Sequence, residues 1–165
     1  MNQVHDFATK LAEGEKYEKI LDDFFFERYK TIKASSDLQK LGIDRIWCDE
    51  FAVWASVEYK ADSRAAETGN AFIEVESVVK EGVSKSIIGW ARKSIAQLLI
   101  YFIPPTGKII VVDMLDVKRK LHEWIPKFGI AESQNKDYHS EGILVPLSEL
   151  EGMAKQTYFI ERDKL

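Results

Sequence analysis

Three largely apolar runs lie in the first half of the chain, at residues 46–48, 51–60 and 71–79. Their length and composition predict three short strands, on which side chains two positions apart lie on the same face. On the second strand this period places Glu58 and Lys60 side by side on one face and leaves the opposite face mainly apolar. The pattern therefore predicts a sheet that carries charged side chains next to its core.

The periodicity elsewhere predicts helices and further strands around this sheet. Apolar residues recur at helical spacing between residues 15 and 29, which is typical of an amphipathic helix. Two apolar runs, at 98–103 and 108–114, flank a Pro-Pro-Thr-Gly turn and predict a hairpin. The remaining expected elements are helices at 88–96, 116–124 and 148–154, strands at 29–32 and 142–145, polar loops at 33–41 and 80–86, and a polar segment at 131–140. We expect a single domain over residues 1–165, of class α/β (α+β), with a mixed β-sheet flanked by helices.

Composition narrows the class of protein further. Hydrophobic residues make up 45% of the 165 residues and charged residues 30%, which is typical of a globular domain with a substantial core. A single cysteine, Cys48, excludes an internal disulfide and a cysteine zinc cluster, and it suits a reducing cytoplasm. The sequence contains no recognisable signal peptide, no apolar run of the roughly 20 residues that a membrane span needs, and no glycine-rich phosphate loop. We therefore expect a cytoplasmic protein without a membrane anchor or a nucleotide cofactor.

Three acidic residues and a lysine lie where the predicted strands could hold a metal ion. Asp44 precedes the first strand, Glu58 and Lys60 lie on the second, and the third carries Glu74. Mg²⁺ prefers carboxylate and water oxygens, so Asp44 and Glu58 would supply part of its coordination shell, which Glu74 could complete. A lysine beside such an ion can orient a water molecule or stabilise charge on a phosphate. The Glu-x-Lys pattern alone is common on solvated strand faces, so its meaning depends on the surrounding elements.

The order of these residues resembles that of the PD-(D/E)XK nuclease superfamily, which has the restriction-endonuclease-like fold. Its members carry a Glu on a first helix, an Asp at the start of a strand, and Asp/Glu-x-Lys on the next strand. The matching positions in this chain are Glu18, Asp44, Glu58 and Lys60. The resemblance spans roughly residues 14–150 and is closest to small nuclease-like proteins of phages and mobile elements and to members similar to Holliday-junction resolvases. Ile43 stands where the superfamily's name has proline, a position that varies among its members.

This resemblance implies a DNA endonuclease that depends on Mg²⁺ or Mn²⁺ and leaves 5′-phosphate and 3′-hydroxyl ends. It implies that Asp44 and Glu58 bind the metal ion, and that Lys60 orients the attacking water and stabilises the charged phosphate. Glu18 and Glu74 would then be outer ligands or ligands of a second ion. Because cleavage of both DNA strands usually requires two sites, the resemblance also implies a homodimer.

The net charge of −4 is unfavourable for a general nucleic-acid-binding protein, which normally carries a basic excess. The candidates for contact with DNA phosphates are Arg64, Lys85, Arg92 and Lys93, although such residues are most often plain surface groups. Two alternatives to an enzyme remain. One is a non-catalytic nucleic-acid-binding or protein-interaction protein on the same fold, and the other is a protein that blocks host defence. Binding of a divalent metal ion separates the nuclease from both.

Overall fold

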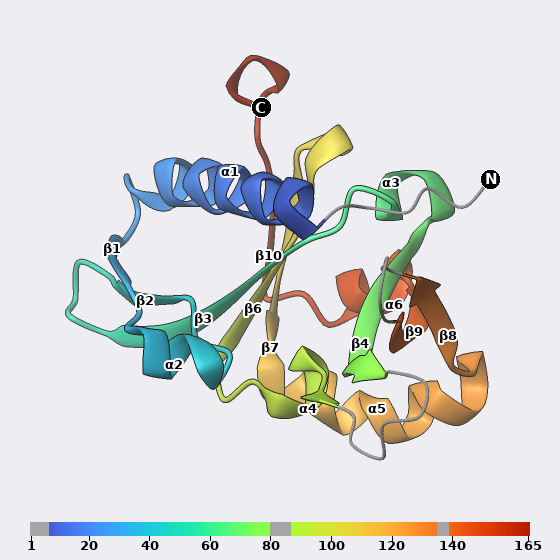
Figure 1. Ribbon diagram of the computed structural model, residues 1–165. Helices are drawn as coiled ribbons and strands as arrows, with labels where there is room; N and C mark the ends of the chain where they lie inside the picture. The colour runs from blue at the N-terminus through green and yellow to red at the C-terminus, as the bar shows by residue number, and fades with distance from the viewer. Residues whose placement is uncertain (1–6, 80–86, 135–138) are drawn as a thin grey trace.

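Six strands form the larger of two sheets in the computed structural model, which describes residues 7–79, 87–134 and 139–165 (Figure 1). Their order across the sheet is β1-β2-β3-β6-β7-β10. β3 and β6 pair in parallel and the other neighbours are antiparallel, so the sheet is mixed, as predicted. The strands are β1 (Lys30–Lys33), β2 (Arg45–Cys48), β3 (Trp54–Ala61), β6 (Leu98–Ile103), β7 (Lys108–Asp113) and β10 (Gln156–Phe159).

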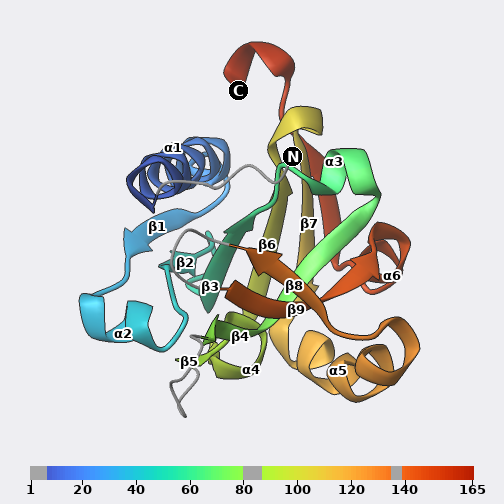
Figure 2. The same cartoon turned by 45° about the vertical axis from the view of Figure 1, so that its right-hand side comes forward.

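A second, antiparallel sheet packs against one face of the first (Figure 2). Its strands, in spatial order, are β5 (Ile87–Ile88), β4 (Asn70–Val79), β9 (His139–Pro146) and β8 (Ala131–Gln134). Buried side chains of both sheets form one hydrophobic cluster, in which Ile73 of the second sheet joins Leu99 and Ile110 of the first. The two sheets therefore share a core, and the polar groups at the edge of that core lie between them.

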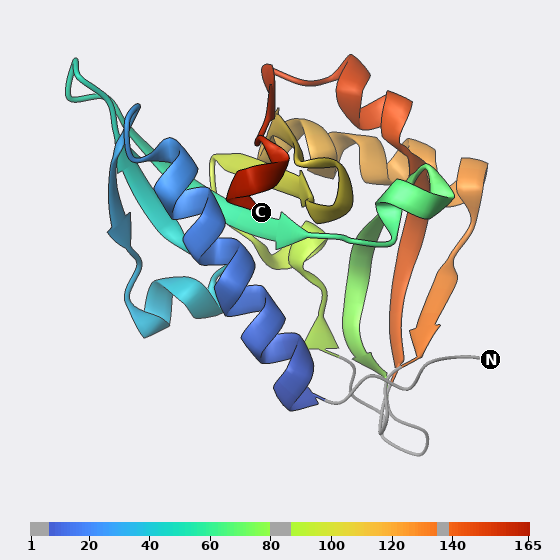
Figure 3. The same cartoon turned by 90° about the horizontal axis from the view of Figure 1, so that it is seen from above.

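Helix α1 (Phe7–Phe25) covers the opposite face of the larger sheet, as Figure 3 shows. Leu21 and Phe25 are fully buried there, in a cluster that includes Trp47 of β2. The amphipathic helix is confirmed, but it begins earlier than residue 15 and ends before residue 29. Helix α1 and the second sheet therefore cover opposite faces of the larger sheet.

The remaining helices are short except for α5 (Met114–Phe128), the helix expected at 116–124, which buries the side chains of Val117, Leu121 and Trp124. Asp113 caps its first turn by accepting a hydrogen bond from a backbone N–H at 3.0 Å. The other helices are α2 (Ser36–Lys40), α3 (Ala65–Thr68), α4 (Trp90–Lys93) and α6 (Leu147–Gly152), with 3₁₀ turns η1 (Pro104–Thr106) and η2 (Arg162–Lys164).

The structure corrects several local predictions. The polar loop expected at 33–41 contains α2, because the Ser35 hydroxyl caps a helical turn by accepting the Leu38 N–H. The helix expected at 88–96 is reduced to the single turn α4 after the short strand β5. Part of the polar segment at 131–140 forms strand β8. Its backbone N–H and C=O groups pair with those of β9, and this pairing does not require apolar side chains. The loop expected at 80–86 lies outside the described residues.

We expect Gly42→Ala to lower the free energy of unfolding by about 2–3 kcal/mol. Gly42 has a φ of +79°, and a Cβ there would lie 2.5 Å from the Ser94 Cβ. Urea unfolding followed by circular dichroism measures the loss. Gly69→Ala is the matched control, because Gly69 has a similar φ of +68° but no heavy atom within 4 Å of the added Cβ. Equal losses in the two variants would show that the contact between Gly42 and Ser94 is unimportant.

Candidate metal site

Asp44 and Glu58 lie side by side because β2 and β3 form a hairpin. Arg45 pairs with Val57, and the same antiparallel register sets Asp44 opposite Glu58. The Asp44 N–H donates to the Val57 carbonyl oxygen at 2.8 Å. Asp44 Oδ2 in turn accepts a hydrogen bond from the Tyr59 N–H at 2.8 Å. These two hydrogen bonds hold both the backbone and the carboxylate of Asp44 against β3.

Glu58 is a buried carboxylate, only 3% exposed. Its Oε1 lies 2.6 Å from the Lys60 Nζ, two positions along the same strand. Its Oε2 has no hydrogen-bond partner in the part of the chain that the structure describes. The buried Ser94 hydroxyl has a single hydrogen, which it donates to the Gly42 carbonyl oxygen at 2.6 Å. One oxygen of a buried carboxylate is therefore left unpaired, and we refer to Asp44, Glu58 and Lys60 together as the candidate metal site.

The charges of this site perturb one another. Burial raises the pKa of the Glu58 carboxyl; the Lys60 ammonium opposes this effect and the Asp44 carboxylate adds to it. Burial lowers the pKa of Lys60, but the carboxylates of Glu58, Asp44 and Glu74 outweigh burial and raise it. Lys60 therefore stays an ammonium at neutral pH. In that form it can orient a water molecule or stabilise negative charge, but it cannot accept a proton.

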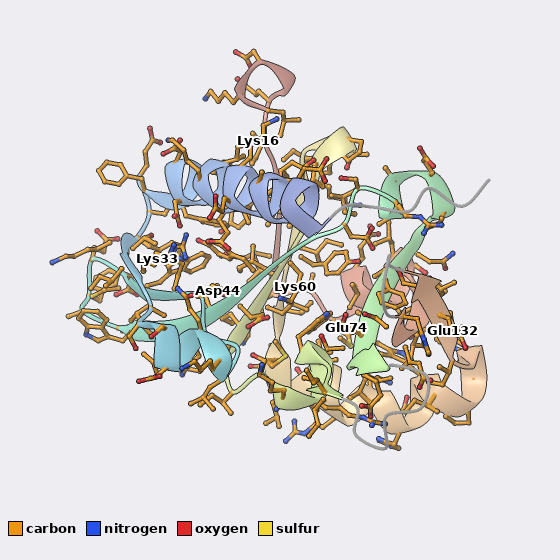
Figure 4. All side chains as sticks on the ribbon, in the orientation of Figure 1. Lys16, Lys33, Asp44, Lys60, Glu74 and Glu132 are labelled. Carbon is orange, nitrogen blue, oxygen red and sulfur yellow. The ribbon has the colours of Figure 1, made fainter. Side chains whose placement is uncertain are left out.

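The donor atoms of Asp44 and Glu58 fit a hard divalent cation. Both residues supply carboxylate oxygens, which Mg²⁺ and Mn²⁺ prefer, and an ion bound to Glu58 Oε2 would satisfy that unpaired oxygen. Glu74, the third predicted ligand, comes from β4 of the second sheet, and Lys60 lies between Asp44 and Glu74 in the view of Figure 4. Among the described residues, these three carboxylates do not form a group with all ligand atoms within 4.8 Å of one another. The structure thus brings together two of the three predicted metal ligands.

Glu18, predicted as a further catalytic residue, lies on the other face of the larger sheet. Its Oε2 accepts a hydrogen bond from Arg45 Nη2 at 2.9 Å. Arg45 also binds Asp22 at 2.8–3.0 Å, and the Tyr59 hydroxyl donates to Asp22 Oδ1 at 3.2 Å. Arg45 and Tyr59 alternate along their strands with the residues of the candidate metal site, so this ion-pair network faces α1 while the site faces the second sheet. The structure therefore does not bring Glu18 together with that site.

The predicted phosphate-binding residues differ in their surroundings. Arg64 is exposed immediately before α3, and Lys93 is exposed in the last turn of α4. Arg92 Nη1 forms an ion pair with Glu76 Oε1 at 2.9 Å. Lys85 lies outside the described residues. All three described candidates are thus exposed, and Arg92 is the one among them that forms an ion pair.

The α4 segment supplies two neighbours of the site that the sequence did not single out as site residues. The Lys60 Nζ lies 5.8 Å from the centre of the Trp90 ring, and Ser94 is fully buried beside Glu58. Backbone hydrogen bonds join the residues flanking α4 to β4 at one end and to Leu41, just before β2, at the other. A tryptophan and a serine at this spacing match no sequence motif. They lie beside the candidate metal site only because the α4 segment connects the two sheets.

A second group of potential metal ligands lies on the smaller sheet. Glu132 of β8 pairs across the sheet with Glu141 of β9, and His139 precedes Glu141 by two positions. One ligand atom from each of these three residues lies within 4.8 Å of the others. The sequence analysis did not single out this group, whose residues lie within or next to the polar segment expected at 131–140. Exposed acidic groups of this kind are common without an ion, so we assign it no function.

No helix in the described ranges combines the length and the apolar character that a membrane crossing requires. Comparisons of the chain with protein-family models, with curated proteins and with solved structures found no match. A function for this chain therefore has to come from the chemistry of its own residues.

Proposed function

We propose that this chain is a Mg²⁺- or Mn²⁺-dependent DNA endonuclease of the PD-(D/E)XK type. The observation that carries this proposal is the unpaired Oε2 of the buried Glu58, which belongs to a carboxylate beside Asp44 and in contact with Lys60. An unpaired buried oxygen destabilises a folded protein, which favours a role in binding. Two carboxylates and a lysine are also the residue types that metal-assisted hydrolysis of a phosphodiester uses.

Each residue of the candidate metal site has a separate role in this proposal. Asp44 and Glu58 hold the metal ion, which when bound activates a water molecule and offsets negative charge on the phosphate. Lys60 remains an ammonium and donates hydrogen bonds to the attacking water or to a phosphate oxygen. The Tyr59 N–H keeps the Asp44 carboxylate oriented toward β3. The products carry 5′-phosphate and 3′-hydroxyl ends.

The proposed substrate is DNA, the proposed location is the cytoplasm, and the proposed partner is a second copy of the chain. One site cuts one strand at a time, so cleavage of both strands of a duplex usually requires two sites. Arg64 and Lys93 are exposed and would contact the DNA phosphates, whereas Arg92 is already engaged by Glu76.

Cleavage of plasmid and branched DNA tests this proposal. We expect wild-type protein to cut in Mg²⁺ or Mn²⁺ but not in EDTA, and we expect Asp44→Ala and Lys60→Ala to lose about 1000-fold or more of the rate. His139→Gln is the matched control, because it disrupts the group on the smaller sheet without touching the candidate metal site. Unchanged cutting by Asp44→Ala and Lys60→Ala would rule out this site as the catalytic centre.

The second candidate is a non-catalytic nucleic-acid-binding or interaction protein. Two observations favour it, the net charge of −4 and the Lys60–Glu58 ion pair. In that case Lys60 is simply the permanent counter-ion of a buried carboxylate. The protein would then cut no DNA substrate, and neither Mg²⁺ nor Mn²⁺ would raise its melting temperature. DNA binding without cleavage, measured by fluorescence anisotropy, would identify the nucleic-acid-binding form of this alternative.

A further inference from the structure

The Lys60 ammonium occupies the position of a cation at the candidate metal site. Its Nζ lies 2.6 Å from Glu58 Oε1, so the lysine neutralises the carboxylate that would bind a metal ion. A divalent ion on Glu58 Oε2 would take up the negative charge of the carboxylate and repel the ammonium on Oε1. The Lys60–Glu58 ion pair is therefore weakened when Glu58 binds a divalent ion. The Lys60 side chain is 32% exposed, against 4% for that of Glu58, so part of it reaches solvent.

Glu74 is the carboxylate that can receive the displaced ammonium. It lies on β4 next to Val75, whose carbonyl oxygen accepts the N–H of the residue before Trp90 at 2.9 Å, and the Trp90 ring centre lies 5.8 Å from the Lys60 Nζ. Its charge also helps to raise the pKa of Lys60. No hydrogen bond or ion pair engages its carboxylate within the described ranges. By contrast, Glu76 is two residues further along the same strand and is paired with Arg92 at 2.9 Å. Glu74 is therefore available to Lys60 in a way that Glu76 is not.

The positions of the three carboxylates also argue against Glu74 as a metal ligand. Asp44 and Glu58 lie on adjacent strands of one sheet, whereas Glu74 belongs to the other sheet. Their ligand atoms do not come within 4.8 Å of one another as a group, and Lys60 lies between Asp44 and Glu74 in Figure 4. The lysine is thus flanked by two carboxylates of the larger sheet and by one of the smaller sheet.

We propose that Glu74 is a positioning residue that accepts the Lys60 ammonium when Asp44 and Glu58 bind a divalent ion. This inference rests on the proposed metal-dependent function. Lys60 has two alternative partners, Glu58 without the ion and Glu74 with it. Trp90, whose ring centre lies 5.8 Å from Nζ, limits how far the ammonium can move. In its second position Lys60 stays beside the site with its N–H groups available to a phosphate.

A double-mutant cycle tests the inference by Mg²⁺ binding alone, measured by isothermal titration calorimetry on the full chain near pH 8. Without Lys60 to displace, Lys60→Met should bind Mg²⁺ roughly tenfold more tightly than wild type. Glu74→Gln should weaken binding roughly fivefold while Lys60 is present, because the ammonium then stays on Glu58. In the Lys60→Met background the same change should have an effect of less than about twofold. Glu76→Gln is the matched control and should leave Mg²⁺ affinity unchanged in both backgrounds.

Each other result overturns the inference. An equal loss of affinity from Glu74→Gln in both backgrounds would make Glu74 a metal ligand, and no loss in either background would leave it without a role. If wild type and every variant fail to bind Mg²⁺ or Mn²⁺, the proposed metal-dependent function fails and the inference fails with it. All proteins carry His139→Gln, so that the group on the smaller sheet does not contribute heat. Lys60→Gln repeats the cycle if circular dichroism shows that Lys60→Met does not fold.

Discussion

Glu58→Gln is expected to abolish metal-dependent DNA cleavage, with a loss of about 1000-fold or more, while the protein remains at least as stable as wild type near neutral pH. Gln has nearly the shape of Glu but no charge, and one carboxylate oxygen becomes an NH₂ group that cannot bind a cation. The substitution also removes the buried charge whose Oε2 is unpaired. Cleavage assays and urea unfolding of the same preparations measure both effects. A stable variant that still cuts DNA would exclude Glu58 as a metal ligand.

The same variant should also change how stability depends on pH. Burial raises the pKa of Glu58 above its ordinary value of 4.5, so the folded state holds this proton more tightly than the unfolded state does. Wild type therefore loses this contribution to stability as pH rises through the raised pKa, and retains it fully only below about 4.5. Gln has no such proton, so the free energy of unfolding of the variant minus that of wild type should grow as pH rises through this interval. Urea unfolding from about pH 4 to pH 8 measures this difference, and a difference that shrinks with rising pH would contradict the assignment.

Arg45→Met is expected to lower the free energy of unfolding by about 3–5 kcal/mol, without placing any new group in the candidate metal site. The Arg45 side chain is only 5% exposed and makes ion pairs with Asp22 and Glu18 of α1. Its Nη1 also donates to the Asp44 carbonyl oxygen at 2.9 Å. Without the guanidinium these oxygens lose their partner, although Asp22 and Glu18 are 31% and 33% exposed and recover part of their hydration. We therefore expect a loss near the lower end of this range.

Urea unfolding measures the loss, and Arg119→Met is the matched control. Arg119 pairs with Asp116 three residues earlier on α5, and both side chains are largely exposed. Exposed pairs of this kind contribute little, so the control should lose about 0.5 kcal/mol or less. A similar small loss in Arg45→Met would show that α1 is held to the sheet mainly by its apolar residues, such as Leu21 and Phe25.

These two substitutions act on opposite faces of the same hairpin. Arg45 and Tyr59 connect β2 and β3 to α1, while Asp44, Glu58 and Lys60 face the second sheet. One face therefore stabilises the fold and the other carries the unpaired carboxylate oxygen. The two sets of residues alternate along the strands. The residues that hold the hairpin to α1 are therefore direct sequence neighbours of the residues in the candidate metal site.

The local part of this arrangement could be predicted from the sequence alone. A strand repeats every two residues, so Glu58 and Lys60 had to share a face once residues 54–61 formed a strand. The short connection between β2 and β3 made them a hairpin and brought Asp44 beside Glu58. The inward side chains of α5 followed from its helical period in the same way. Each of these features depends on residues that are close together in the chain.

Only the tertiary structure decided on which side of the sheet the other acidic residues lie. The apolar stripe of α1 predicted an amphipathic helix, but only the docking of that helix on the face that carries Arg45 set Glu18 apart from the candidate metal site. Glu74 was predicted on a strand, yet that strand joined a second sheet because β4 pairs with β9, far along the chain. Hydrophobic period is a property of a local segment, whereas strand partners and helix docking depend on contacts between distant segments, for which a single sequence carries no local pattern.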